Sequence, residues 1–133
     1  MVTLIIHLAV YPYLPVTVPY HWDINGHVDR TGHKSIELII AIIPFLLYLL
    51  MSYKPKFDPK KEAYRKHKKA YSIFVFVTIL FFSCLSFVVL LISMGYSIPI
   101  VPIFGGILGG LTIVLGNYMR QIRQNYFFGI KTP

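Results

Sequence analysis

The separation of charged from apolar residues is the feature that most constrains this chain. No charged residue occurs between positions 70 and 119, and Glu37 is the single charge between positions 35 and 53. Hydrophobic residues make up 56% of the 133 residues and charged residues 14%, whereas charged residues form about a quarter of a soluble domain. Uncharged apolar stretches of about 20 residues match the thickness of a bilayer. We therefore expect an integral membrane protein.

Three segments are predicted to cross the membrane as helices, at about residues 35–53, 70–94 and 98–119. Residues 1–14 are apolar but shorter. Fourteen helical residues reach only about 21 Å across a hydrocarbon layer of roughly 30 Å, so we predict a weak first span there. The expected fold class is an all-α integral membrane protein, with residues 1–133 forming a single polytopic domain.

Residues 14–34, with the sequence LPVTVPYHWDINGHVDRTGHK, interrupt this apolar pattern. Pro15 and Pro19 fix the backbone angle φ and remove two N–H donors, so no helix is expected to run through the segment. Gly26 and Gly32 permit turns. Histidine, tryptophan and aspartate side chains are concentrated between the prolines and the end of the segment. We therefore predict that this loop carries the chemistry or the recognition, and that the helices hold it in place.

The distribution of Lys and Arg predicts the orientation. Residues 54–69 carry eight of the 13 basic residues, and basic segments next to membrane spans favour the cytoplasmic side. The basic loop and the C-terminal segment, residues 117–133, are therefore expected to be cytoplasmic, and the 14–34 loop extracytoplasmic. The net charge of +8 suits contact with anionic lipid. Nucleic acid is not an expected partner, because no recognition motif accompanies the charge.

Two glycine pairs lie four residues apart in the third predicted span, at Gly105, Gly106, Gly109 and Gly110. Small residues at this spacing let another helix approach closely. We predict that the approaching helix is a neighbouring span of the same chain. The alternative is a homodimer that packs through these glycines.

Two motifs resemble those of SdpI-like bacterial membrane proteins. The N-terminal motif is Leu-Pro, a second proline, His-Trp, then Gly and Asp, here at Leu14, Pro15, Pro19, His21, Trp22, Gly26 and Asp29. The C-terminal motif matches at Gly116, Asn117, Tyr118, Ile122, Arg123, Asn125, Tyr126, Phe127, Gly129, Lys131, Thr132 and Pro133. The two motifs occur in the family's order and the resemblance covers essentially the whole chain.

The resemblance implies immunity against a secreted toxic peptide, together with signalling by sequestration of a transcriptional repressor at the membrane. It makes partner-binding candidates of His21, Trp22, Gly26 and Asp29 in the outer loop and of Arg123, Asn125, Tyr126, Gly129 and Thr132 near the C-terminus. No catalytic residue, enzymatic activity or cofactor is expected. Family members usually have a full first span and continue beyond Thr-Pro, so the chain is expected to be a shortened member or a fragment.

Two other functions stay open on the sequence. Weak candidates for a divalent-metal site in the outer loop are His21, Asp23, His27, Asp29 and His33. Histidine and carboxylate together suit zinc or a similar ion, although no HExxH motif supplies a general base.

The second open function is a membrane scaffold or a transport component. Transport requires ionisable residues inside the membrane, and the three firm spans offer only Glu37, near one end. His7 lies in the short apolar segment, where a histidine can be functional, but it lies close to the chain start.

Overall fold

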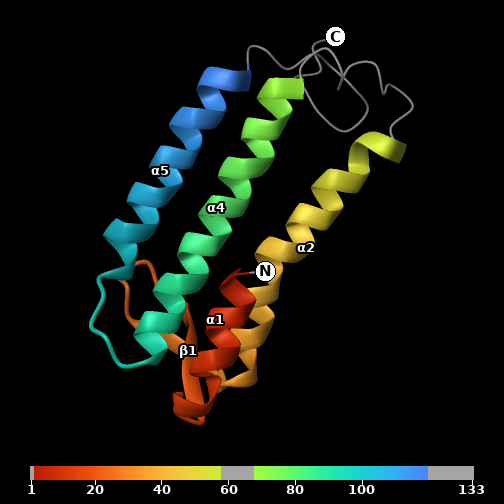
Figure 1. Cartoon of the computed structure of the whole chain (residues 1–133). Helices are drawn as coiled ribbons and strands as arrows, with labels where there is room; N and C mark the ends of the chain where they lie inside the picture. Colours follow the sequence, from red (N-terminus) through yellow and green to blue (C-terminus); the bar gives the residue numbers. More distant parts are fainter. Residues whose placement is uncertain (1, 58–67, 120–133) are drawn as a thin grey trace.

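Three long helices lie side by side in a row, with α4 in the middle (Figure 1). The computed structural model describes residues 2–57 and 68–119. The helices are α2 (Ser35–Phe57), α4 (Lys68–Ser93) and α5 (Ile100–Met119). Each contains a stretch that is long and apolar enough to cross a membrane. The three predicted spans are therefore confirmed, and the chain is a multi-pass membrane protein.

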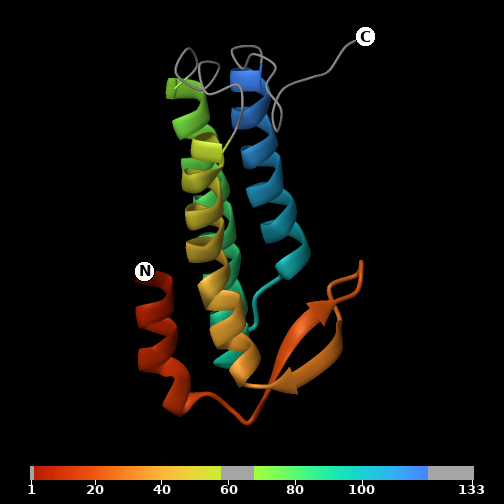
Figure 2. The same cartoon turned by 90° about the vertical axis from the view of Figure 1, so that its right-hand side faces the viewer.

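A short apolar helix precedes this row. Helix α1 (Val2–Val10) is followed by one turn of 3₁₀ helix, η1 (Tyr11–Tyr13). Helix α1 packs against α2 and α4, alongside the half of the bundle that lies nearest the hairpin (Figure 2). The prediction of a short N-terminal helix is confirmed. Ala41 is fully buried on α2, and its backbone carbonyl accepts a hydrogen bond from the Thr3 hydroxyl at 3.3 Å.

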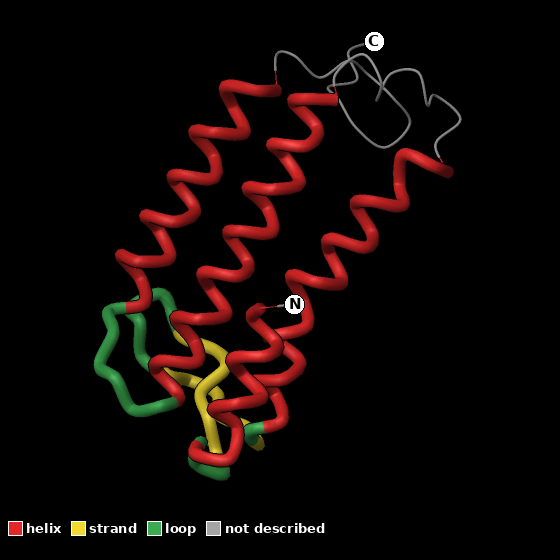
Figure 3. The backbone as a smooth tube through the Cα atoms, viewed as in Figure 1, coloured by secondary structure: helices red, strands yellow, loops and turns green. Residues whose placement is uncertain are grey.

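The segment expected to be an irregular loop is a β-hairpin, which the sequence analysis did not predict. Strands β1 (Thr17–Trp22) and β2 (Val28–His33) pair antiparallel beneath the row of helices (Figure 3). The register pairs Thr17 with His33 and Val18 with Gly32, and it shifts around His21. Val18 is fully buried, and β1 contacts both α4 and α2. The hairpin is thus attached to the bundle through its first strand.

A glycine ends α4 and turns the chain back toward α5. Gly95 has a φ of 96°, a conformation that side chains with a Cβ resist. Its N–H donates to the carbonyl of Ile92, and the N–H of Tyr96 donates to the carbonyl of Leu91. These two bonds form a Schellman motif, which satisfies carbonyls left open at a helix end. The turn brings α5 up beside α4, where Phe104 meets Phe81 edge to face.

The prediction that the glycines of α5 pack on a neighbouring span of this chain is wrong. A Cβ added at Gly105, Gly106, Gly109 or Gly110 would meet nothing within 4 Å among the described residues. The spacing permits close approach, but α4 meets α5 through larger side chains instead. A homodimer through these glycines stays a prediction.

Gly26 at the hairpin tip provides a test of the backbone conformation of the turn. Its φ is 87°, and an added Cβ would lie 3.1 Å from a methyl carbon of Val101 at the start of α5. Gly26→Ala should lower the free energy of unfolding by about 1–2 kcal/mol, the cost of a left-handed alanine. Denaturant titration in detergent micelles measures this quantity. Gly105→Ala is the matched control and should not destabilise the protein, because its Cβ meets open space inside a helix. Equal losses in both variants would contradict a left-handed backbone at Gly26.

Candidate functional site

The hairpin brings two of the predicted site residues into direct contact. His21 on β1 and Asp29 on β2 form an ion pair, with His21 Nδ1 2.7 Å from Asp29 Oδ1. Both side chains are about half exposed, so the pair contributes little to stability. It instead holds an imidazole and a carboxylate together across the two strands of the hairpin.

The turn between the strands is organised by Asp23. Its Oδ1 accepts hydrogen bonds from the backbone N–H groups of Asn25, at 2.9 Å, and His27, at 2.8 Å. The backbone of Asp23 also bonds to His27 and Gly26, as in a three-residue hairpin loop that closes with a left-handed glycine. The N–H of His27 stabilises the charged form most strongly and holds the pKa of Asp23 below its usual value of 3.8.

A groove separates the hairpin from α4 and α5, with a volume of about 670 Å³. Its walls come from the hairpin residues Tyr20, His21, Trp22, Asp23 and Ile24 and from the helix residues Leu85, Val89, Ile100, Val101 and Phe104. The helix side is entirely apolar, and the polar groups lie on the hairpin side. Binding sites for small ligands run from about 300 to 1,000 Å³. The groove is therefore large enough for a few apolar side chains of a bound partner.

The candidate metal ligands are divided between separate contacts. His21 binds Asp29, His27 Nδ1 lies 3.4 Å from Asp23 Oδ2, and His33 bonds to Ser35. Within residues 2–57 and 68–119, no three histidine, cysteine or acidic side chains gather as a metal site would require. The five candidate ligands thus do not converge on one point in the hairpin.

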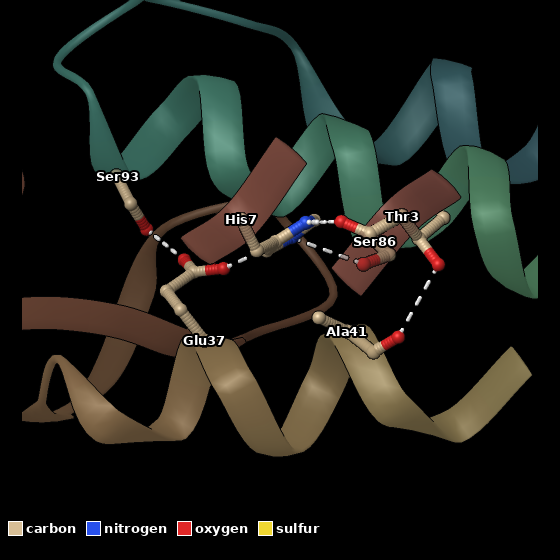
Figure 4. Close-up of polar contacts among 6 residues, drawn as sticks. All are labelled: Thr3, His7, Glu37, Ala41, Ser86 and Ser93. Atoms are coloured by element: carbon tan, nitrogen blue, oxygen red, sulfur yellow. Dashed lines mark hydrogen bonds and ion pairs between the residues drawn. The ribbon is translucent and has the colours of Figure 1, made fainter. Parts of the chain in front are cut away.

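A second polar cluster lies inside the bundle, where α1, α2 and α4 meet (Figure 4). His7 on α1 and Glu37 on α2 are both 0% exposed, and His7 Nε2 lies 3.6 Å from Glu37 Oε2. Ser86 and Ser93 on α4 complete the cluster. Ser86 Oγ lies 3.1 Å from His7 Nε2, and the Ser93 hydroxyl donates to Glu37 Oε1. An ionisable pair buried between apolar helices is a candidate functional site.

Both ionisable residues stand out in the sequence, but their pairing was not predicted. His7 and Glu37 are separated by the whole hairpin, and each was weighed alone. A signal was available, because an ionisable side chain in an apolar span needs a partner of opposite charge. The polar loop is flanked by the apolar helices α1 and α2. His7 is the histidine of α1 and Glu37 is the acid of α2.

The candidates in the C-terminal motif, Arg123, Asn125, Tyr126, Gly129 and Thr132, lie outside the described residues. Most of the basic loop, residues 58–67, lies outside them as well.

A family model and a known protein are similar to this chain. A family model described as a domain of unknown function, DUF1648, matches residues 1–51. This match contains α1, the hairpin and most of α2. The immunity protein SdpI of Bacillus subtilis (strain 168) is 28% identical over 126 residues, which are 95% of this chain and 58% of that protein. The chain thus spans little more than half the length of this curated relative. No solved structure matches the chain.

The row of apolar helices, with a polar hairpin at one end, defines a multi-pass membrane protein. The two sequence matches support the view that this chain is an SdpI-like family member. The resemblance found in the sequence motifs is therefore confirmed.

The lowered pKa of Asp23 predicts how the hairpin tip responds to acid. Because the folded-state pKa lies below 3.8, the carboxylate stabilises the turn above that pH, and the contribution is lost as the pH falls through the lowered pKa. In NMR spectra of the labelled chain in micelles, the amide signals of Asn25 and His27 should titrate with a midpoint below 3.8. The amide of Asp23→Asn accepts the same bonds without ionising, so its signals should not titrate there. A wild-type midpoint at or above 3.8 would contradict this description of the turn.

Proposed function

We propose that this chain is an SdpI-like immunity protein that protects the cell carrying it from a secreted toxic peptide. The observation that supports this role most directly is the groove between the hairpin and the start of α5. In the proposed topology the hairpin faces outward, because the basic residues 54–69 favour the cytoplasmic side. The groove is then open where a secreted peptide would arrive.

The chemistry of the groove suits an amphipathic peptide segment. Its helix wall, which includes Val89, Val101 and Phe104, can bury apolar side chains. On the opposite wall, His21 and Trp22 offer an imidazole and an indole. Aromatic side chains that bury large areas beside polar groups are typical anchors in binding sites. In this proposal, the His21–Asp29 pair presents the imidazole in one orientation, because Asp29 accepts its Nδ1–H.

We also propose that the opposite face of the membrane holds the signalling role. The basic residues 54–69 and the C-terminal motif around Arg123 would retain a transcriptional repressor there. In this proposal a charge reversal in the basic loop, or loss of Arg123, frees the repressor. No enzymatic activity is expected, and the similarity to an immunity protein favours this view.

A survival assay tests the immunity role and its location together. Cells sensitive to an SdpC-like toxic peptide would express the wild-type chain, a groove-filling variant or an empty vector, with membrane insertion checked for each. Val101→Trp places a large ring in the groove. It should lower the tolerated peptide concentration at least about tenfold, which corresponds to a loss of about 1.4 kcal/mol of binding free energy.

Two further variants sharpen the assay. Ile113 lies on the same helix, is 68% exposed and does not line the groove. The Ile113→Trp variant should therefore protect as the wild type does. His21→Ala should lose protection while still inserting. If the inserted wild-type chain gives no protection against this peptide, immunity against it is not the function of this chain. If Val101→Trp protects fully, the peptide binds elsewhere.

A further inference from the structure

The buried pair of His7 and Glu37 is not used by the groove, and its chemistry is unusual for its position. Both side chains are 0% exposed within the protein. An isolated charge of either kind would be costly inside the membrane. A buried charge is tolerated when a partner neutralises it. The protonation of one residue is therefore tied to that of the other.

The hydrogen bonds of His7 leave a single nitrogen available for proton exchange. Nδ1 lies 2.8 Å from the backbone carbonyl of Thr3. A carbonyl only accepts, so Nδ1 carries a hydrogen in every protonation state. Nε2 is then bare in the neutral ring and protonated in the imidazolium. The Ser86 hydroxyl, 3.1 Å away, can donate to the bare nitrogen or accept from the protonated one.

Glu37 presents one oxygen to that nitrogen. Its Oε1 accepts from the Ser93 hydroxyl. Its Oε2 is buried and has no hydrogen-bond partner among the described residues. It lies 3.6 Å from Nε2 and is turned toward it (Figure 4). One proton can therefore reside on either side of this gap, as O–H facing a bare nitrogen or as N–H facing a carboxylate.

Among the described residues, no other charged side chain contacts the pair. Helix α4 has no charged residue from Ala70 to Ser93, and its titratable side chains are Tyr71 and Cys84. Tyr71 donates to the carbonyl of Met51 at 2.6 Å.

Two cationic or titratable side chains of the hairpin segment, Lys34 and His21, have partners outside the cluster. Lys34 donates to the Tyr11 carbonyl and lies over the Tyr11 ring, and His21 is bound to Asp29. In the described part of α1, His7 is the one ionisable side chain. The pair is consequently neutral only when it holds one proton. With two protons its charge is +1, and with none it is −1.

We propose that His7 and Glu37 form a proton-binding site within the membrane, and that the single bound proton keeps α1 docked on α2 and α4. Gaining a second proton or losing the first leaves a net charge between the three helices. Water must then reach that charge, which separates α1 from its partners. The proposal does not depend on the immunity function, and no toxic peptide is needed to test it.

The test measures helix docking and carboxyl protonation in the same samples. The full chain would be placed in phosphatidylcholine nanodiscs, with Cys84→Ser and spin labels at two exposed positions, Leu8 on α1 and Leu46 on α2. Distances between the labels would be recorded from about pH 4 to about pH 10, which brackets free carboxyl and imidazole groups. The wild type should show one narrow distance distribution in a middle pH window, and should lose it at both the acidic and the alkaline limit.

Two single variants separate the acidic transition from the alkaline transition. Glu37→Gln cannot lose a proton, so it should lose only the alkaline transition. His7→Gln cannot gain one, so it should lose only the acidic transition. The double variant should stay docked throughout. Thr112→Ala is the matched control, since it removes a hydroxyl that bonds to the Leu108 carbonyl on α5, outside the cluster, so both transitions should remain.

Infrared spectra of the wild type keep the proposal testable if a variant fails to insert. Glutamate labelled with ¹³C at its carboxyl carbon, in a Glu62→Gln background, reports on Glu37 alone. Its carboxyl band should be replaced by a carboxylate band, as the pH rises, across one of the two transitions: the alkaline one if the shared proton resides on Glu37, or the acidic one if it resides on His7. A band that keeps one form over the whole range would overturn the proposal. So would a wild-type distance that never changes, or a double variant that retains both transitions.

Discussion

The contact between His7 and Glu37 determines how the short first helix is positioned. Apolar faces of two helices can slide past one another by a turn at little cost, because one aliphatic contact replaces another. An imidazole nitrogen meets a carboxylate in only one register, and a mismatch would leave a buried charge unpaired. Removing one partner of such a pair costs about 3–5 kcal/mol. The depth of α1 along α2 and α4 is therefore specified by this pair, rather than by the apolar contacts around it.

That register in turn places the hairpin. Helix α1 continues through η1 toward β1, and β2 ends two residues before Ser35, the first residue of α2, so both strands leave helices that are already held together. Lys34 spans the junction, because its ammonium group bonds to the Tyr11 carbonyl. A two-stranded hairpin alone is only marginally stable in water. Here Leu14 and Val18 are buried, and the tip meets α5 at Val101. The groove exists because the hairpin is held at both ends.

The sequence was sufficient to predict the parts of the fold that depend on local composition. A span requires only enough consecutive apolar residues, and all three predicted spans are present. The two prolines correctly excluded a helix, and Gly26 lies in a turn as expected. The strand pairing was not predicted, because residues 17–22 and 28–33 show no strict apolar alternation. Their register depends on contacts with α4 that are distant in sequence. The glycine pairs misled for a related reason: their spacing permits a close approach but does not supply a partner.

Stability alone does not account for the composition of the buried cluster. Well-packed apolar side chains in place of a buried ion pair are often neutral or stabilising. The same position here also holds Thr3, Ser86 and Ser93, each of which is costly to bury without a hydrogen bond. The two serine hydroxyls share a property that apolar residues lack. Each can donate or accept, so the cluster can follow a proton from oxygen to nitrogen without moving a helix. A set of groups that solvates both positions of one proton, and becomes charged when it gains a second or loses the first, is suited to holding that proton rather than to filling space.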